Sequence, residues 1–273
     1  MNTHLNGRRR AAVAAGVVLT ALAGTACGDG STSGAASSST TTAEASSTTL
    51  VEAAPVIDPG DGGRYDPKID PADFVDTVDK PYFPLAVGST WVYEGMSEGE
   101  VERIEIEVLD ERKEIMGISA TVVRDIVYIA DEIVEDTLDW YAQDRDGNVW
   151  YLGESVKDYE NGEVVSTDGS FEVGVDGALP GIVMLAEPTV GDAYRQEFYA
   201  GEAEDLGEIL RVDAEKEVAF GSYDEVVVTE DWNPLDPEPI EEKYYAPGVG
   251  LIFETHTRGP AGSVELQDFS PGA

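Results

Sequence analysis

The chain has 273 residues and carries 55 acidic against 17 basic side chains, for a formal net charge of −38. Such a chain is repelled by phosphate, so nucleic-acid binding and docking on anionic lipid through a basic patch are excluded. The single cysteine excludes an internal disulfide. Of the two histidines, His4 belongs to the N-terminal signal described below, which ends just before Cys27, so His256 is left alone and a Cys–His pair and a histidine-based zinc site are excluded. No dedicated cofactor is expected, although an acidic surface can gather Ca²⁺ weakly.

Residues 1–26 have the layout of an export signal. Residues 8–10 are arginines, residues 11–23 are apolar, and Gly24, Thr25 and Ala26 lead into Cys27. This segment resembles the lipobox of bacterial lipoproteins, with Gly24 where that family usually has leucine. In that family the cysteine receives a diacylglyceryl group, the signal is cut before it, and the new N-terminus is acylated. The resemblance implies a mature protein that starts at Cys27 and is anchored by acyl chains on the extracytoplasmic face of the cell membrane.

Residues 27–65 are predicted to form a disordered tether. The segment is rich in Ser, Thr, Ala and Gly and has almost no large apolar side chain, so it cannot bury enough surface to offset the entropy of ordering. As a flexible coil it would span about 35 Å. The Ser/Thr run could also carry O-linked sugar, and the sequence leaves both a bare and a glycosylated tether open.

Residues 66–273 are predicted to form one all-β domain. Apolar and polar residues alternate in 103–108, which indicates a half-buried strand. The same pattern, with Gly-containing turns between the segments, predicts strands at 121–129, 137–141, 149–152, 194–199, 208–212, 226–229, 243–246 and 251–254. Only short helices are expected, near 71–75 or within 179–185.

The domain also carries the signs of an internal duplication. Val87-Gly88, Val108, Gly117 and Tyr141 recur about 104 residues later as Val190-Gly191, Val212, Gly221 and Tyr245. This spacing predicts two related four-stranded halves, 81–154 and 189–258, separated by an insertion at 155–188. Together they predict a curved antiparallel sheet or open barrel of about 8–10 strands.

Two motifs flank these halves. They are Pro81-Tyr82-Phe83-Pro84-Leu85, followed by Gly88 and Trp91, and the run 245–251 at the other end. This layout resembles uncharacterised bacterial envelope proteins, which are similar to the curved half-barrels of periplasmic lipoprotein carriers. The resemblance implies a curved sheet with a concave face.

Two sets of side chains are candidate binding residues. Aromatic side chains on a curved sheet can line a pocket or fill the core, and the candidates for a ligand site are Trp140, Trp150, Tyr199 and Tyr245, with Arg195. Glu202, Glu204 and Asp205 concentrate carboxylates beside aromatic residues and are the candidates for a metal site; the alternative is a solvated acidic loop. His256 is interpreted as a strand-end residue rather than a catalytic base.

These features predict a non-catalytic binding or carrier module for an apolar or envelope-derived ligand. No nucleophile motif supports an enzyme. Two alternatives stay open: a carboxylate-dependent hydrolase or cation-assisted enzyme acting on cell-wall glycan, and a structural domain that binds only a protein partner.

Overall fold

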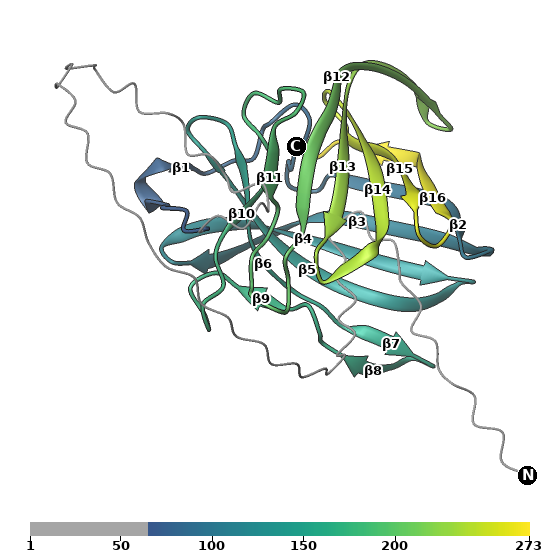
Figure 1. The fold of residues 1–273 in the computed structure, drawn as a ribbon, viewed down its shortest axis with the longest axis horizontal. Coiled ribbons are helices and arrows are strands. Elements are labelled where there is room, and N and C mark those ends of the chain that lie inside the picture. The colour runs from purple at the N-terminus through teal and green to yellow at the C-terminus, as the bar shows by residue number, and fades with distance from the viewer. Residues whose placement is uncertain (1–64) are drawn as a thin grey trace, which may run out of the picture.

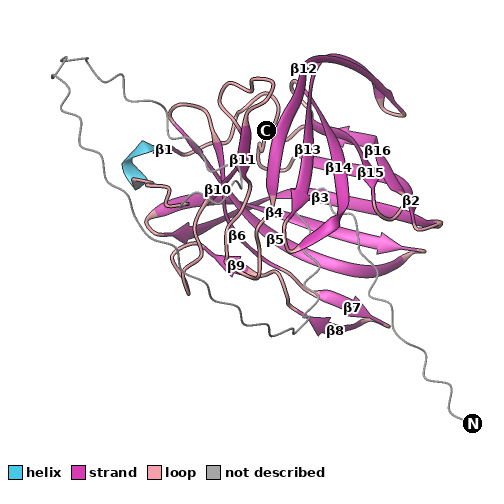
Figure 2. Ribbon diagram, in the orientation of Figure 1, coloured by secondary structure: helices cyan, strands magenta, loops and turns pink. Residues whose placement is uncertain are grey.

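The computed structural model describes residues 65–273. The predicted signal, Cys27 and nearly all of the predicted tether lie outside the described residues. The all-β prediction is confirmed: the described residues form sixteen strands in one antiparallel sheet and one 3₁₀ turn (Figures 1 and 2). No helix among them is long and apolar enough to cross a membrane.

Ten strands form two consecutive meanders. The first contains β2 (Thr90–Ser97), β3 (Glu100–Ile115), β4 (Ile118–Ile129), β5 (Glu132–Asp144) and β6 (Val149–Ser155). The second contains β11 (Ala193–Arg195), β12 (Leu206–Val218), β13 (Gly221–Asn233), β14 (Asp236–Ala246) and β15 (Gly250–Arg258). Short turns join most of these strands. At Met116 and Gly117, between β3 and β4, both residues have positive φ, as a tight hairpin between twisted strands requires.

The remaining elements flank these meanders. They are the 3₁₀ turn Pro71–Asp73, β1 (Phe74–Val75), β7 (Asp158–Glu160), β8 (Glu163–Ser166), β9 (Phe171–Glu172), β10 (Gly181–Met184) and β16 (Gly262–Ser270). The helix expected near 71–75 is this 3₁₀ turn, capped by the Asp70 side chain. The alternative position within 179–185 is wrong, because that segment forms the fully buried strand β10. The strand expected at 194–199 ends at Arg195.

The strand order follows the predicted duplication, with larger halves than expected. The main path of the sheet is β10-β6-β5-β4-β3-β2-β16-β15-β14-β13-β12-β11. Each meander of five strands is therefore extended by one more, β10 beyond β6 and β16 beyond β15. The prediction of four strands in each half is too small. Each meander already has five, and the sixth strand of each half lies outside the predicted bounds, since β10 falls in the predicted insertion and β16 follows residue 258.

The two halves meet at two junctions of different strength. β16 pairs with β2 along its whole length, and Gly95 of β2 lies so close to Ser263 that a β-carbon there would overlap the Ser263 carbonyl oxygen. At the other junction β10 and β11 lie side by side (Figure 1), joined by the bridge between Leu179 and Phe198. Gly181 approaches the backbone of Gln196 there in the same way. The sheet is thus strongly curved. It stays open between its two end strands, β10 and β11, which do not form a continuous ladder with each other.

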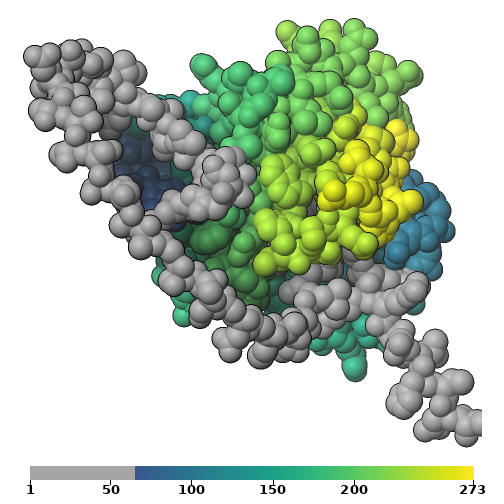
Figure 3. Space-filling model, in the orientation of Figure 1, coloured from purple at the N-terminus to yellow at the C-terminus, as the bar shows by residue number. Residues whose placement is uncertain are grey.

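The curved sheet encloses a core that is partly apolar and partly charged. Ile104, Val127, Ile209 and Ile252 are among the side chains that are fully buried. In the space-filling view, the residues of the second half, coloured green to yellow, gather on one side of the molecule (Figure 3). Charged side chains are buried in the same core, which is uncommon for Asp, Glu and Lys unless they are paired.

Candidate functional site

The interior of the sheet is lined by carboxyl groups because whole strand faces are polar. Successive side chains in a strand point to opposite faces, so Glu135, Thr137, Asp139 and Tyr141 share one face of β5 and all four are buried. On β14, Glu241, Lys243 and Tyr245 share a face in the same way. Because side chains alternate between the two faces of a strand, these polar residues all point to the interior of the sheet. The residues between them, on the opposite face, are also partly buried.

The lysine cluster consists of Asp231, Glu241, Lys243, Glu254 and His256, on β13, β14 and β15. The Lys243 ammonium lies 3.2 Å from Asp231, 3.4 Å from Glu241 and 3.8 Å from Glu254. Cross-strand pairing sets this arrangement, because Lys243 is opposite Glu254 and Glu241 is opposite His256. The Lys243 side chain is only 5% exposed, so its charge acts in a medium that screens it weakly.

The lysine determines which carboxyl groups in its cluster stay ionised. Burial opposes the charge of Lys243, but Asp231, Glu254 and Glu241 outweigh it and raise its pKa well above the ordinary value. Burial also opposes ionisation of Glu241, yet Lys243 and the hydrogen bond with His256 lower the pKa of that carboxyl. Glu254 behaves differently, since burial and the charge of Glu241 raise its pKa well above normal.

The second group, the lysine-free cluster, consists of Glu135, Asp139, Glu154, Glu197 and Asp205. It contains no lysine, and Lys243 of the first cluster acts only at its edge, where it opposes the rise in the pKa of Asp205. Burial is the largest cause of a raised pKa at each of them. It raises the pKa of Glu135 to about 8 and those of Asp139 and Asp205 to about 7. These carboxyl groups therefore hold protons near neutral pH. After burial, the charge of Asp205 is the largest cause of the raised pKa of Glu197.

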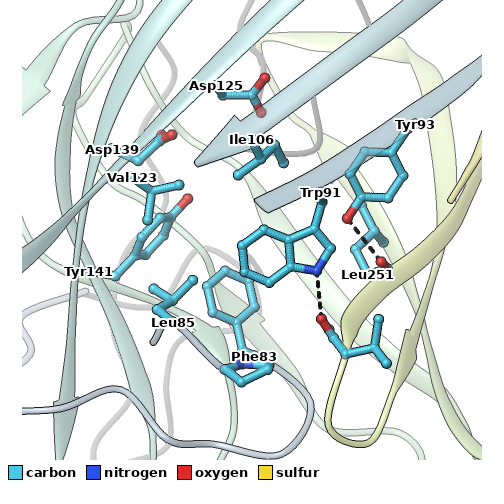
Figure 4. A pocket seen from close by; sticks show the side chains of 13 residues that line it. Phe83, Leu85, Trp91, Tyr93, Ile106, Val123, Asp125, Asp139, Tyr141 and Leu251 are labelled. Atoms are coloured by element: carbon cyan, nitrogen blue, oxygen red, sulfur yellow. Dashed lines mark hydrogen bonds between the residues drawn. The ribbon is translucent and has the colours of Figure 1, made fainter. Parts of the chain in front are cut away.

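An apolar pocket opens beside this lining (Figure 4). Phe83, Leu85 and Trp91 form its wall, and Asp125 and Asp139 lie at its inner end. The Trp91 indole donates to the Val249 carbonyl at 2.8 Å, and this bond fixes the ring. The cavity volume is about 50 Å³, which suits a few water-sized molecules and is far below the several hundred Å³ that a ligand such as an acyl chain needs.

A larger hollow lies where β5 and β6 meet the insertion. Its volume is about 320 Å³, within the range of small-molecule sites. Trp140, Glu154 and Phe171 form its buried floor, while Val175 and Asp176 of the insertion are exposed. Tyr199, Ser155, Ser170 and Glu172 complete the lining. The hollow thus combines flat aromatic faces with carboxyl and hydroxyl groups.

The structure brings two of the predicted ligand residues together. Trp140 and Tyr199 line the same hollow, and the Lys113 ammonium lies 4.5 Å from the centre of the Trp140 ring. Trp150 instead packs against Phe74 and donates its indole N–H to Asp144 at 2.8 Å. Tyr245 is buried in the interior and lines neither cavity.

Arg195 packs its guanidinium over two aromatic rings. Its central carbon lies 4.6 Å from the centre of the Phe198 ring and 5.6 Å from that of Tyr65. Arg195 therefore belongs to the junction between β10 and β11 and lines neither cavity.

The predicted metal residues do not converge. Glu202 is exposed, and Glu204 accepts a hydrogen bond at 2.8 Å from the Gly201 backbone in the same turn. Asp205 is buried, and burial raises its pKa to about 7. Among the described residues, three metal-ligating side chains come together at Glu241, Glu254 and His256 instead. The signal for this group is in the sequence, because Glu254 and His256 are two residues apart and so share a face of one strand.

No protein-family model and no curated protein matches the chain. Two solved structures are similar to it. One is a protein proposed to be exported, with a YmcC-like fold, from Bacteroides fragilis; it is 13% identical, has a TM-score of 0.41, and the match covers 70% of this chain and 99% of that chain. The other, proposed to be a lipoprotein from Parabacteroides distasonis, is 13% identical with a TM-score of 0.39 and coverage of 72% and 100%. The fold described above rests on the strand pairing of this chain itself.

Proposed function

We propose that the protein is a lipid-anchored, extracytoplasmic and non-catalytic binding module, and that its ligand is an envelope glycan rather than an acyl chain. The observation that carries the proposal is the 320 Å³ hollow with Trp140 and Tyr199 in its lining. Aromatic faces stack on sugar rings, and carboxyl and hydroxyl groups hydrogen-bond to their hydroxyls. The pocket of Figure 4 argues against an acyl chain because its volume is about 50 Å³.

The binding test uses the full chain purified in detergent. Soluble peptidoglycan fragments are titrated into it by calorimetry, with palmitate as the apolar competitor. We expect the fragments to bind and palmitate not to bind. Trp140→Phe should weaken fragment binding about tenfold, because the ring that stacks on the ligand becomes smaller.

Trp150→Phe is the matched control. Trp150 is buried to a similar extent on the neighbouring strand but lies outside the hollow, so this variant should bind fragments like the wild type. Palmitate binding without fragment binding would overturn the choice of ligand. Release of new reducing ends from the fragments during the titration would show hydrolysis and reject a non-catalytic module.

The location is tested separately. We expect the Cys27→Ala variant to leave the membrane fraction, because without acyl chains nothing holds the domain at the bilayer. Ser33→Ala, in the predicted tether, is the control and should stay with the membrane. A Cys27→Ala variant that remains membrane-bound at the wild-type level would show that the anchor is wrong.

A further inference from the structure

Glu241, Glu254 and His256 form a compact group that the proposed binding function does not use. One ligand atom from each lies within 4.8 Å of the other two. Glu241 and His256 are cross-strand partners on β14 and β15, and Glu254 precedes His256 by two residues. All three side chains therefore project from the same face of one strand pair, and the backbone pairing fixes their separation.

His256 is oriented as a metal-binding imidazole would be. Its Nδ1 lies 2.6 Å from the Pro260 carbonyl oxygen, which can only accept, so Nδ1 carries the proton. Nε2 is directed at Glu241, 3.0 Å from Oε1, and the His256 side chain is 5% exposed. Without an ion, this short separation needs a second proton on the imidazole; a bound metal ion would take the place of that proton. A ring N–H donated to a backbone carbonyl is the usual device that fixes the tautomer and orientation of a histidine ligand.

Glu254 supplies an independent sign that a ligand belongs here. Its side chain is 0% exposed, and neither carboxyl oxygen has a hydrogen-bond partner. The nearest cation is Lys243, whose ammonium is 3.8 Å away and is held nearer to Asp231 and Glu241. A buried carboxyl without a donor is costly, and an ion bound between Glu254 and Glu241 would remove that cost.

We propose that Glu241, Glu254 and His256 bind one divalent transition-metal ion of the Zn²⁺ type. An imidazole nitrogen and two carboxylates suit Zn²⁺ better than Ca²⁺, which prefers six or more oxygens. The excess of acids also favours a dication, because the carboxyl groups of Asp231, Glu241 and Glu254 lie within 4 Å of a single lysine. Glu241 is 24% exposed and provides the route from solvent.

The test is calorimetry on the full chain in detergent, stripped with chelator and dialysed before titration with ZnCl₂ or CaCl₂. We expect one Zn²⁺ per chain, bound at least about tenfold more tightly than Ca²⁺. Glu254→Gln and His256→Gln should each weaken Zn²⁺ binding by about 100-fold or more, since each removes a direct ligand. Zn²⁺ should also raise the melting temperature of the wild type but not of Glu254→Gln.

Glu242→Gln is the matched control. Glu242 lies next to Glu241 but points to the opposite face, where it accepts from Arg211 at 2.9 Å, so Zn²⁺ binding should be unchanged. Glu254→Gln replaces a buried carboxyl group by an amide of the same shape and should fold, so it carries the test even if His256→Gln does not. Absence of Zn²⁺ binding, wild-type binding in Glu254→Gln, or a preference for Ca²⁺ would each overturn the site.

Discussion

The two buried carboxyl clusters show two ways of keeping acids inside a sheet. In the lysine cluster, one ammonium group lies within 4 Å of three carboxyl groups and lowers the pKa of Glu241. In the lysine-free cluster, burial raises the pKa values instead, to about 7 at Asp139 and about 8 at Glu135. One cluster is stabilised by an internal cation, the other by protons taken from solvent.

The repeated strand order makes this comparison sharper. Asp139 and Lys243 occupy the same place in the two halves, on β5 and β14, and each is followed two residues later by a buried tyrosine, Tyr141 or Tyr245. The two clusters therefore differ at one equivalent position. The lysine cluster has a cation there, Lys243, and forms ion pairs, whereas the lysine-free cluster has an acid, Asp139, and holds protons. Substitutions at or near these positions test that difference.

The largest effect is expected when the internal cation is removed. Lys243→Met should lower the free energy of unfolding by about 3–5 kcal/mol, because Asp231 and Glu241 are left as buried carboxylates without their partner. The measurement is urea denaturation at pH 8.

Lys216→Met is the control for this substitution. The Lys216 ammonium lies on the outer face of the sheet, 3.2 Å from the centre of the Phe253 ring, and its loss should cost about 1 kcal/mol or less. If Lys243→Met were as stable as Lys216→Met, the lysine would not be what holds the acidic cluster together.

The next effect concerns pH and the lysine-free cluster. The unfolded chain loses the Glu135 proton near pH 4.5, but the folded protein keeps it until about pH 8. The stability that this group contributes is therefore complete below pH 4.5 and is lost as the pH rises to about 8, at up to about 1.4 kcal/mol per pH unit. Glu135→Gln should flatten this fall and be more stable than the wild type at pH 8.

Glu132→Gln is the control on the same strand. Glu132 is exposed, so its variant should follow the wild-type dependence between pH 5 and pH 8 in thermal melts. A wild-type protein that becomes more stable over that range would contradict the proton-holding description of the cluster.

Much of the fold follows from the sequence because alternation of period two is a strong signal. The strands at 103–108 and 121–129 lie within β3 and β4, and the 104-residue offset matches the repeated strand order. β10 was missed because Gly181, Ile182, Val183 and Met184 form a short, continuous apolar run, and such a run does not distinguish a buried strand from a short helix.

The charged interior did not follow from the sequence. In a chain with 55 acids, the polar face of β5 has the pattern of a solvated surface. It is buried because aromatic side chains cover it: Tyr151 stacks on Tyr141, and Phe171 of the insertion packs edge-on against Tyr151. The sequence did not indicate His256 as a metal ligand, because a single histidine does not fit the familiar zinc motifs. Its position opposite Glu241 depends on the register between β14 and β15, which the sequence does not give.

The smallest effect on stability is expected when the acid at position 139 is made neutral and no cation is added. Asp139→Asn keeps an acceptor for the Tyr151 hydroxyl, which lies 2.5 Å from the Asp139 carboxyl, so stability should change by about 1 kcal/mol or less. After burial, the charge of Asp139 is the largest cause of the raised pKa of Glu154. The substitution should therefore lower the pKa of Glu154, as measured by NMR titration of ¹³C-labelled glutamate carboxyls.

Asp146→Asn, in the exposed turn that follows β5, is the control and should leave the Glu154 titration unchanged. If Asp139→Asn also left it unchanged, the carboxyl groups of the lysine-free cluster would titrate independently, and its contrast with the lysine cluster would reduce to burial alone.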